Sequence, residues 1–143
     1  MPFTPSGRRA YVANTGAGSV TPINTVTGQA LRAIKVGESP IGIVIAHRGR
    51  TAYVINFVSQ TVTPIPIKTD TAGLPIKAGH GPGAAAFSPD GKTLYVADYG
   101  FPRNAPGKPG HYVTPVRTAA GTPGTAIKVG TYPIAIIIVP ARK

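Results

Sequence analysis

The sequence predicts an all-β protein built from a repeated unit of about 42 residues, and three observations support this prediction. Val, Ile, Ala and Thr are abundant, and 18 Gly and 16 Pro accompany them, which favours strands and turns over helices. No segment shows the sustained apolar spacing of an amphipathic helix. Short motifs also recur at nearly constant intervals along most of the chain, which indicates a repeat architecture.

Three motifs define the repeat. Tyr-Val begins at residues 11, 53 and 95, so both steps are 42 residues. Val-Thr-Pro begins at residues 20, 62 and 113, and Ile-Lys-X-Gly begins at residues 34, 76 and 127, so the second step is 51 residues in both motifs. The additional residues fall between Tyr99 and Gly110. This common register predicts three units, at about residues 3–44, 45–86 and 87–137, in a single domain over residues 1–143.

Each unit is expected to contain four strands, which are clearest in the second unit. Pro40–Ala46 is almost continuously apolar, which suits a strand buried on both faces. Thr51–Phe57 carries Tyr-Val, and Thr61–Lys68 contains two prolines that place it toward the periphery. Leu74–Ala78 includes a lysine that blocks edge-to-edge pairing. A buried first strand and a protected last strand predict the blade of a β-propeller.

Three stretches carry a family resemblance: Tyr11-Val12-Ala13-Asn14, the turn Ser88-Pro89-Asp90-Gly91-Lys92-Thr93 and the entry Val36-Gly37-Glu38-Ser39-Pro40. They resemble the YVTN family of β-propeller repeats over nearly the whole chain. The third unit departs from the motif, since Asp98 stands where Asn14 and Asn56 stand in the others. The resemblance implies a surface-layer or secreted propeller, and therefore a location outside the cell or at its surface. It transfers no functional residue, because the motif positions are structural.

The two ends of the chain are out of step with the strand order. Residues 2–7 match residues 86–91, at the tail of a first strand, whereas residues 133–139 match 82–88, which form a first strand. Since propellers have 4–8 blades, we expect two copies to form a six-bladed homodimeric ring in which each C-terminal strand completes the partner's first blade. The alternatives are a fragment of a longer propeller of about seven blades and a head-to-tail filament. The residues expected at the contact are Phe3, Tyr11, Ile134, Ile136 and Ile138.

The sequence lacks recognisable catalytic and metal-binding motifs. Its four acidic residues do not pair by spacing, its three histidines form no metal-binding motif, and it has no nucleophile elbow or phosphate loop. The absence of Cys excludes disulfides and thiolate ligands. We therefore expect a non-enzymatic scaffold or binding protein without cofactor or metal ion. The alternative is an enzyme with a site in the ring channel.

Positions that differ between the units are the candidates for ligand binding. The entry to each first strand carries Glu38-Ser39, His80-Gly81 or Thr131-Tyr132, on the face that also bears the additional residues. In that insertion, an aromatic ring and two positive charges suit an anionic or sugar partner, although a plain surface loop or a subunit contact is an equally simple interpretation. The candidate ligand-binding residues are Glu38, His80, Tyr132, Phe101, Arg103 and Lys108.

The net charge of +11 points to an anionic surface or polysaccharide, or to solubility, rather than to nucleic acid, because the basic residues are spread along the chain. Arg8, Arg9, Arg48, Arg50 and Lys92 fall at turns of one face, and Lys35, Lys77 and Lys128 fall on the outer rim. Residues 1–9 lack the apolar segment of a signal peptide. The longest apolar run, residues 134–139, is too short to span a bilayer.

Overall fold

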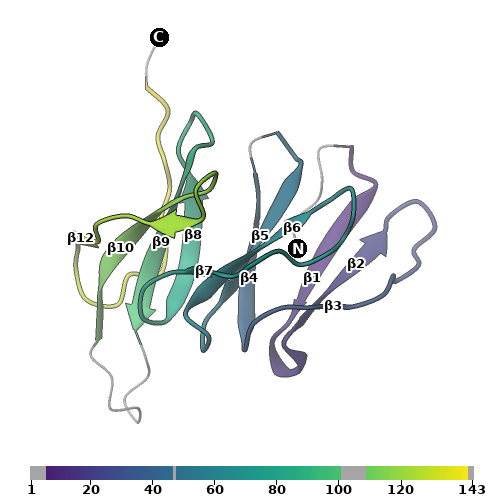
Figure 1. Cartoon of the computed structure of the whole chain (residues 1–143), viewed down its shortest axis with the longest axis horizontal. Coiled ribbons are helices and arrows are strands. Elements are labelled where there is room, and N and C mark those ends of the chain that lie inside the picture. The colour runs from purple at the N-terminus through teal and green to yellow at the C-terminus, as the bar shows by residue number, and fades with distance from the viewer. Residues whose placement is uncertain (1–5, 47, 101–108, 142–143) are drawn as a thin grey trace.

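The computed structural model describes residues 6–46, 48–100 and 109–141. These residues form antiparallel strands and one short 3-10 helix, η1 (Thr15–Ala17). Three sheets stand side by side along the long axis of the molecule (Figure 1). Within the described ranges, no helix has the length and hydrophobicity needed to cross a membrane.

Each sheet follows the order of its strands in the chain. The first sheet contains β1 (Arg9–Asn14), β2 (Ser19–Asn24) and β3 (Ile34–Lys35). The second contains β4 (Pro40–Ile45), β5 (Thr51–Asn56), β6 (Thr61–Pro66) and β7 (Ile76–Lys77). The third contains β8 (Pro82–Phe87), β9 (Thr93–Gly100) and β10 (Pro109–Arg117), with β11 (Thr122–Pro123) and β12 (Ile127–Lys128) both paired with β10.

The strand register repeats from sheet to sheet. The tyrosine of each Tyr-Val motif lies opposite the proline of the Val-Thr-Pro motif in the facing strand, as Tyr11↔Pro22, Tyr53↔Pro64 and Tyr95↔Pro115. The two described first strands, β4 and β8, each enter through a proline that is followed by a register irregularity. The recurring sequence motifs therefore correspond to recurring three-dimensional positions.

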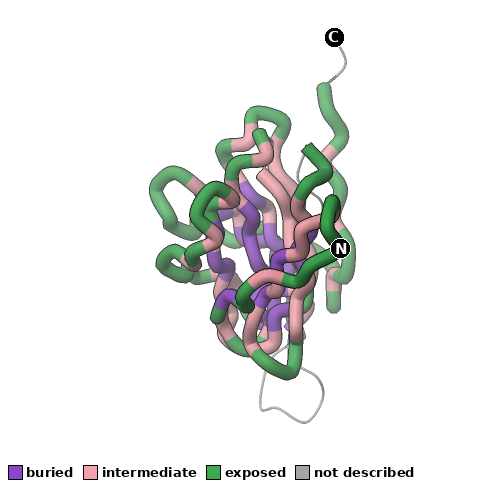
Figure 2. Tube along the Cα trace, turned by 90° about the vertical axis from the view of Figure 1, so that its right-hand side faces the viewer, coloured by how far each residue is buried: buried purple, intermediate pink, exposed green. Residues whose placement is uncertain are grey.

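The hydrophobic core lies between the sheets. One cluster joins the first and second sheets, and a second cluster joins the second and third sheets. The buried positions are concentrated in the middle of the molecule, with exposed loops around them (Figure 2). Because each sheet is only one layer thick, it gains its burial from the neighbouring sheet.

The first strands are less buried than the sequence predicts. In β4 only Pro40 is fully buried and Ile41 is 44% exposed, whereas Ala52–Asn56 of β5 are all buried. The expectation that Pro40–Ala46 is buried on both faces is therefore wrong. The physical reason is that a first strand forms the edge of its sheet, so only one neighbouring strand covers it.

Candidate functional site

The entry loops adopt the same backbone conformation at their equivalent positions. Ser39, Gly81 and Tyr132 all have left-handed φ angles, of 53°, 60° and 56°. A left-handed conformation costs a residue with a Cβ roughly 1–2 kcal/mol, so only Gly81 adopts it without strain. Ser39 and Tyr132 therefore place side chains on a turn that the fold imposes.

The entry-loop candidates do not converge on one pocket. Glu38 is exposed and lines a pocket of about 390 Å³ with residues 15–18, 35, 36, 39 and 58. His80 is also exposed, and it is not among the residues that line this pocket. Its backbone carbonyl accepts a hydrogen bond of 2.9 Å from the amide of Gly100. Phe101, Arg103 and Lys108 lie outside the described residues.

Tyr132 belongs to a row of aromatic rings that runs over this face. Its ring centroid lies 5.3 Å from that of Tyr99, which lies 6.4 Å from that of Phe57. Tyr132 is 41% exposed, and the other two rings are half-buried. Our sequence interpretation missed Phe57 and Tyr99. The signal was present, because each ring stands four residues after the tyrosine of its Tyr-Val motif.

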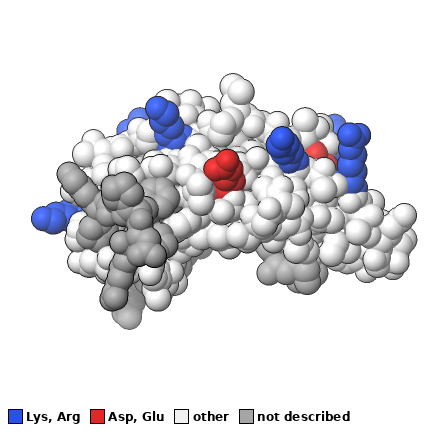
Figure 3. All heavy atoms as spheres, turned by 90° about the horizontal axis from the view of Figure 1, so that it is seen from below, with Lys and Arg blue, Asp and Glu red and all other residues white. Residues whose placement is uncertain are grey.

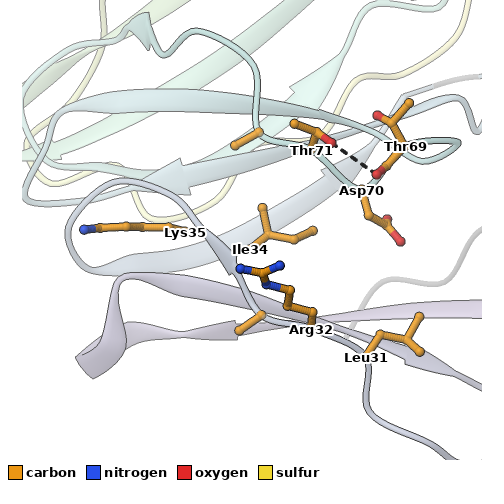
Figure 4. A pocket seen from close by; sticks show the side chains of 9 residues that line it. Leu31, Arg32, Ile34, Lys35, Thr69, Asp70 and Thr71 are labelled. Carbon is orange, nitrogen blue, oxygen red and sulfur yellow. Dashed lines mark hydrogen bonds between the residues drawn. The ribbon is translucent and has the colours of Figure 1, made fainter.

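A larger pocket lies between the first and second sheets, and Lys35 lines both this pocket and the one beside Glu38. Its volume is about 590 Å³, with residues 31–35 on one side and residues 69–72 on the other (Figure 4). Arg32 and Lys35 supply positive charge to it, and Asp70 lies on the opposite wall. A small anion could lie beside the two basic groups. Asp70 does not pair with these groups, because its carboxylate is bound by Arg9 and Tyr11.

Asp70 joins the two sheets through its carboxylate. Oδ2 accepts a hydrogen bond of 2.5 Å from the Arg9 guanidinium, and Oδ1 accepts one of 2.6 Å from the Tyr11 hydroxyl. Burial and the bond to Asp70 raise the pKa of Tyr11 above its usual value. Glycine stands at the equivalent positions Gly28 and Gly121, also with positive φ. Asp70 therefore has a left-handed backbone conformation (φ 51°), and its side chain bonds to the first sheet from that position.

The side chain of Tyr11 is not available for the expected contact with a second copy, so only the backbone edge of β1, which pairs with β2 alone in the described residues, can take part in one. Tyr11 is fully buried in the cluster between the first and second sheets of its own chain. Of the other expected contact residues, Ile134 is 73% exposed, and Ile136 and Ile138 are half-buried. Phe3 lies outside the residues that the structure describes.

Asp98 is buried at the boundary between the second and third sheets, with 2% of its surface exposed. Oδ2 accepts a hydrogen bond of 2.6 Å from the Thr114 hydroxyl, and Oδ1 accepts one of 3.1 Å from the amide of Gly79. Burial raises the pKa of Asp98 to about 6, against the effect of these hydrogen bonds. At the equivalent position, Asn56 donates to Thr63 at 2.8 Å.

Basic side chains are dispersed over the surface. Figure 3 shows the face with the entry loops, where Lys and Arg stand apart from one another rather than gathering in a patch. Arg8, Arg48, Arg50 and Lys92 are exposed, as are the rim residues Lys35, Lys77 and Lys128. Arg9 differs from the rest of its set, since it is held by Asp70. In the ranges that the structure covers, no group of three or more His, Asp or Glu side chains forms a metal site.

Comparison with known proteins gives a fold but no family. No protein-family model and no curated protein matches the chain. Among solved structures, the chain is similar to the hydrazine synthase of Kuenenia stuttgartiensis, with a TM-score of 0.80 and 25% identity over 91% of this chain. It is also similar to a Bacteroides uniformis protein provisionally assigned as a 6-phosphogluconolactonase (TM-score 0.79, 20% identity, 97% of this chain). The WD40 repeats of RRP9 match with a TM-score of 0.72 and 14% identity over 90% of this chain.

The chain spans only part of each of these proteins, between 35% and 43% of their lengths. Their names include both enzymes and WD40 repeats, so the likeness does not extend to one activity. The shared feature is the arrangement of repeated antiparallel sheets. The chain therefore has the WD40-like fold of β-propeller proteins.

Proposed function

We propose that this chain is a non-enzymatic β-propeller scaffold of the YVTN type, which assembles with a second copy into a six-bladed ring. The proposal places the protein outside the cell or at its surface, as the motif resemblance implies. Its entry-loop face and its basic turns are then available for partners. The enzyme named as an alternative above has no set of residues in the described structure that favours it.

The observation that carries this proposal is an unpaired strand edge together with an unpaired extended segment. In the second and third sheets, β5 and β9 carry a first strand on one edge and a third strand on the other. In the described part of the first sheet, β1 pairs only with β2. Residues 133–141 are assigned to no strand, and Ile134, Ile137 and Val139 are 73%, 83% and 78% exposed. An exposed apolar segment and an open edge favour strand addition.

The motif alignment supports a specific register for this addition. Residues 133–138 correspond to β4, in which Val44 lies opposite Tyr53 and Ile43 opposite Val54. The same register pairs the backbone of Ile137 with that of Tyr11, and the backbone of Ile136 with that of Val12, of the second copy. The C-terminal segment then supplies the first strand of the partner's first sheet.

The solution mass tests the assembly. We expect light scattering to give about twice the chain mass of 14.7 kDa at micromolar concentration. Ile137→Asp is expected to shift this mass toward the monomer, because its equivalent Val44 packs against the core. Ile134→Asp is the matched control, since its equivalent Ile41 remains 44% exposed in β4. A monomeric wild-type chain would contradict the proposal, and equal effects of the two substitutions would contradict the register.

The exposed basic turns support a second part of the proposal, which is contact with an anionic surface or polysaccharide. Arg48, Arg50 and Lys92 are exposed at the turns that follow β4 and β8, and Arg8 is exposed just before β1. Retention on immobilised dextran sulfate is expected to fall in Arg48→Ser/Arg50→Ser and to weaken with salt, because exposed charges are screened within about 10 Å at 0.1 M ionic strength. Retention that does not change with salt would contradict this part.

A further inference from the structure

We propose that the open face of the third sheet docks on the open face of the first sheet of a second copy, through the same contacts that join neighbouring sheets within the chain. This inference rests on the proposed assembly and adds the surface that holds it. The evidence is that each boundary inside the chain uses equivalent residues, and that one matching half of such a boundary lies at each side of the molecule. Ala10 and Val113 of these halves are buried, but the other four side chains are more exposed than their equivalents inside the chain.

The boundaries inside the chain provide the template. Each uses three apolar side chains from the earlier sheet and three from the later sheet, all buried. The first boundary contains Tyr11, Val20 and Ile34 against Ala52, Val54 and Ile65. The second contains Tyr53, Val62 and Ile76 against Leu94, Val96 and Val116. The motif alignment makes these two sets equivalent residue by residue.

Two further half-sets remain without a partner sheet in the chain. The third sheet presents Tyr95, Val113 and Ile127, and the first sheet presents Ala10, Val12 and Ile23. Ile127 is 48% exposed, whereas its equivalents Ile34 and Ile76 are 8% and 5% exposed. Val12 is half-buried, whereas its equivalents in the second and third sheets are fully buried. The two faces are therefore the missing halves of one boundary.

A glycine contact supports the same pairing independently. A Cβ on Gly37 would lie 2.7 Å from Cγ of Asn56, and a Cβ on Gly79 would collide with the carboxylate of Asp98. Each glycine closes its motif and allows the next sheet to approach. Gly130 is the third member, and a Cβ there would meet nothing within 4 Å. Docking would place Gly130 against Asn14 of the second copy, which is the remaining member of the Asn/Asp set.

The tyrosine contact points to the same partner. Tyr11 donates to Asp70, in the loop after the third strand of the next sheet, and the hydroxyl of Thr118, in the corresponding loop, acts to lower the pKa of Tyr53, which burial raises. Tyr95 is only half-buried, and its equivalent target is the loop that ends at Gly28 of the second copy. Each copy offers one face of each kind, so two copies close a ring of six sheets, within the 4–8 blades of propellers.

A substitution at Gly130 separates this surface from the rest of the assembly. Gly130→Val leaves the isolated chain unstrained, but it would place methyl groups against Asn14 of the second copy. Overpacking of this kind is expected to raise the dissociation constant about 10- to 100-fold in sedimentation equilibrium. Gly16→Val is the matched control, because a Cβ at Gly16 also meets nothing within 4 Å. An unchanged dissociation constant in Gly130→Val would overturn the docking surface.

Disulfide trapping tests the contact directly, because the chain contains no native Cys. We expect Asn14→Cys/Gly130→Cys to oxidise to a covalent dimer, whereas Gly37→Cys/Asn56→Cys, with its in-chain contact, oxidises to a monomer. A ladder of higher species would overturn the closed ring. If Asn14→Cys/Gly130→Cys forms no interchain disulfide while the wild-type chain has the mass of a dimer, the docking surface is overturned but the assembly is not. A monomeric wild-type mass would overturn the proposed assembly with it.

Discussion

Replacement of Asp98 by Asn is expected to stabilise the protein above pH 6 and to have little effect at pH 4. The third sheet places a carboxylate where the first two place the amides of Asn14 and Asn56, and the site is fully enclosed. Asn fits the same contacts, because its oxygen can accept from Gly79 and its amide can bond to Thr114 as Asn56 does to Thr63. The substitution therefore removes a buried charge without removing its partners.

The magnitude follows from the pKa. Burial raises the pKa of Asp98 from 3.8 to about 6, so between these values the folded chain holds a proton that the unfolded chain has released. The free energy of unfolding therefore falls as pH rises from about 4 to 6 and then stays constant. At about 1.36 kcal/mol per pH unit, the loss at pH 7 is about 3 kcal/mol. The Asp98→Asn variant would not suffer this loss, which corresponds to a gain of roughly 10 °C in Tm.

Urea unfolding from pH 4 to pH 8 measures this difference. The wild-type free energy of unfolding is expected to decline by about 3 kcal/mol over this range relative to Asp98→Asn. Asn56→Asp provides the reciprocal variant, since it introduces a carboxylate at the equivalent buried position and is expected to add a second decline of the same sign. The reasoning is refuted if Asp98→Asn is no more stable than the wild type at pH 7.5, or if the two curves run parallel.

Four other substitutions test the boundaries between sheets. Tyr11→Phe removes the bond to the Asp70 carboxylate and is expected to lower the free energy of unfolding by about 1.5–3 kcal/mol; an unchanged urea midpoint would contradict it. Ile76→Ala is expected to cost about 2–5 kcal/mol in the isolated chain, whereas Ile127→Ala, at a half-exposed position, is expected to cost less than about 1 kcal/mol; equal losses would show that the two positions are not packed differently. Gly79→Ala forces a methyl group onto a carboxylate and is expected to lower Tm clearly in a thermal melt followed by circular dichroism.

The first two strands of the second unit could be predicted closely from the sequence, whereas the fourth, expected over Leu74–Ala78, is only the two residues Ile76–Lys77. Pro40–Ala46 and Thr51–Phe57 were expected, and β4 and β5 end one residue earlier in each case. This accuracy has a physical origin, because short turns bound the strands and the preference of β-branched and aromatic residues for strands is a local property. The order of strands within the sheet follows from the same local information, since consecutive strands pair.

The contacts between sheets could not be predicted in the same way. The bond from Tyr11 to Asp70 joins residues that are 59 positions apart, and nothing in either segment alone indicates the other. The sequence therefore did not reveal that a neighbouring sheet of the same chain covers the Tyr11 side chain. The repeat alignment did contain a signal, since Asp70 replaces glycine and Asp98 replaces asparagine at equivalent positions. The positions where the three units differ therefore indicate the residues at the boundaries, whereas the positions that the units share do not.

The acidic residues of this chain distinguish one boundary between sheets from another. Arg9 finds a carboxylate at Asp70 of the second sheet, but it would face Gly121 if it met the third sheet. The glycine that ends the second unit meets Asp98, whereas the first meets Asn56. Because the Arg9–Asp70 ion pair can form only where the first sheet meets the second, it favours the second sheet as the neighbour of the first. If Asp70 were Gly and Asp98 were Asn, as in the other units, the boundaries would be alike. Chain connectivity alone would then set the order of the sheets.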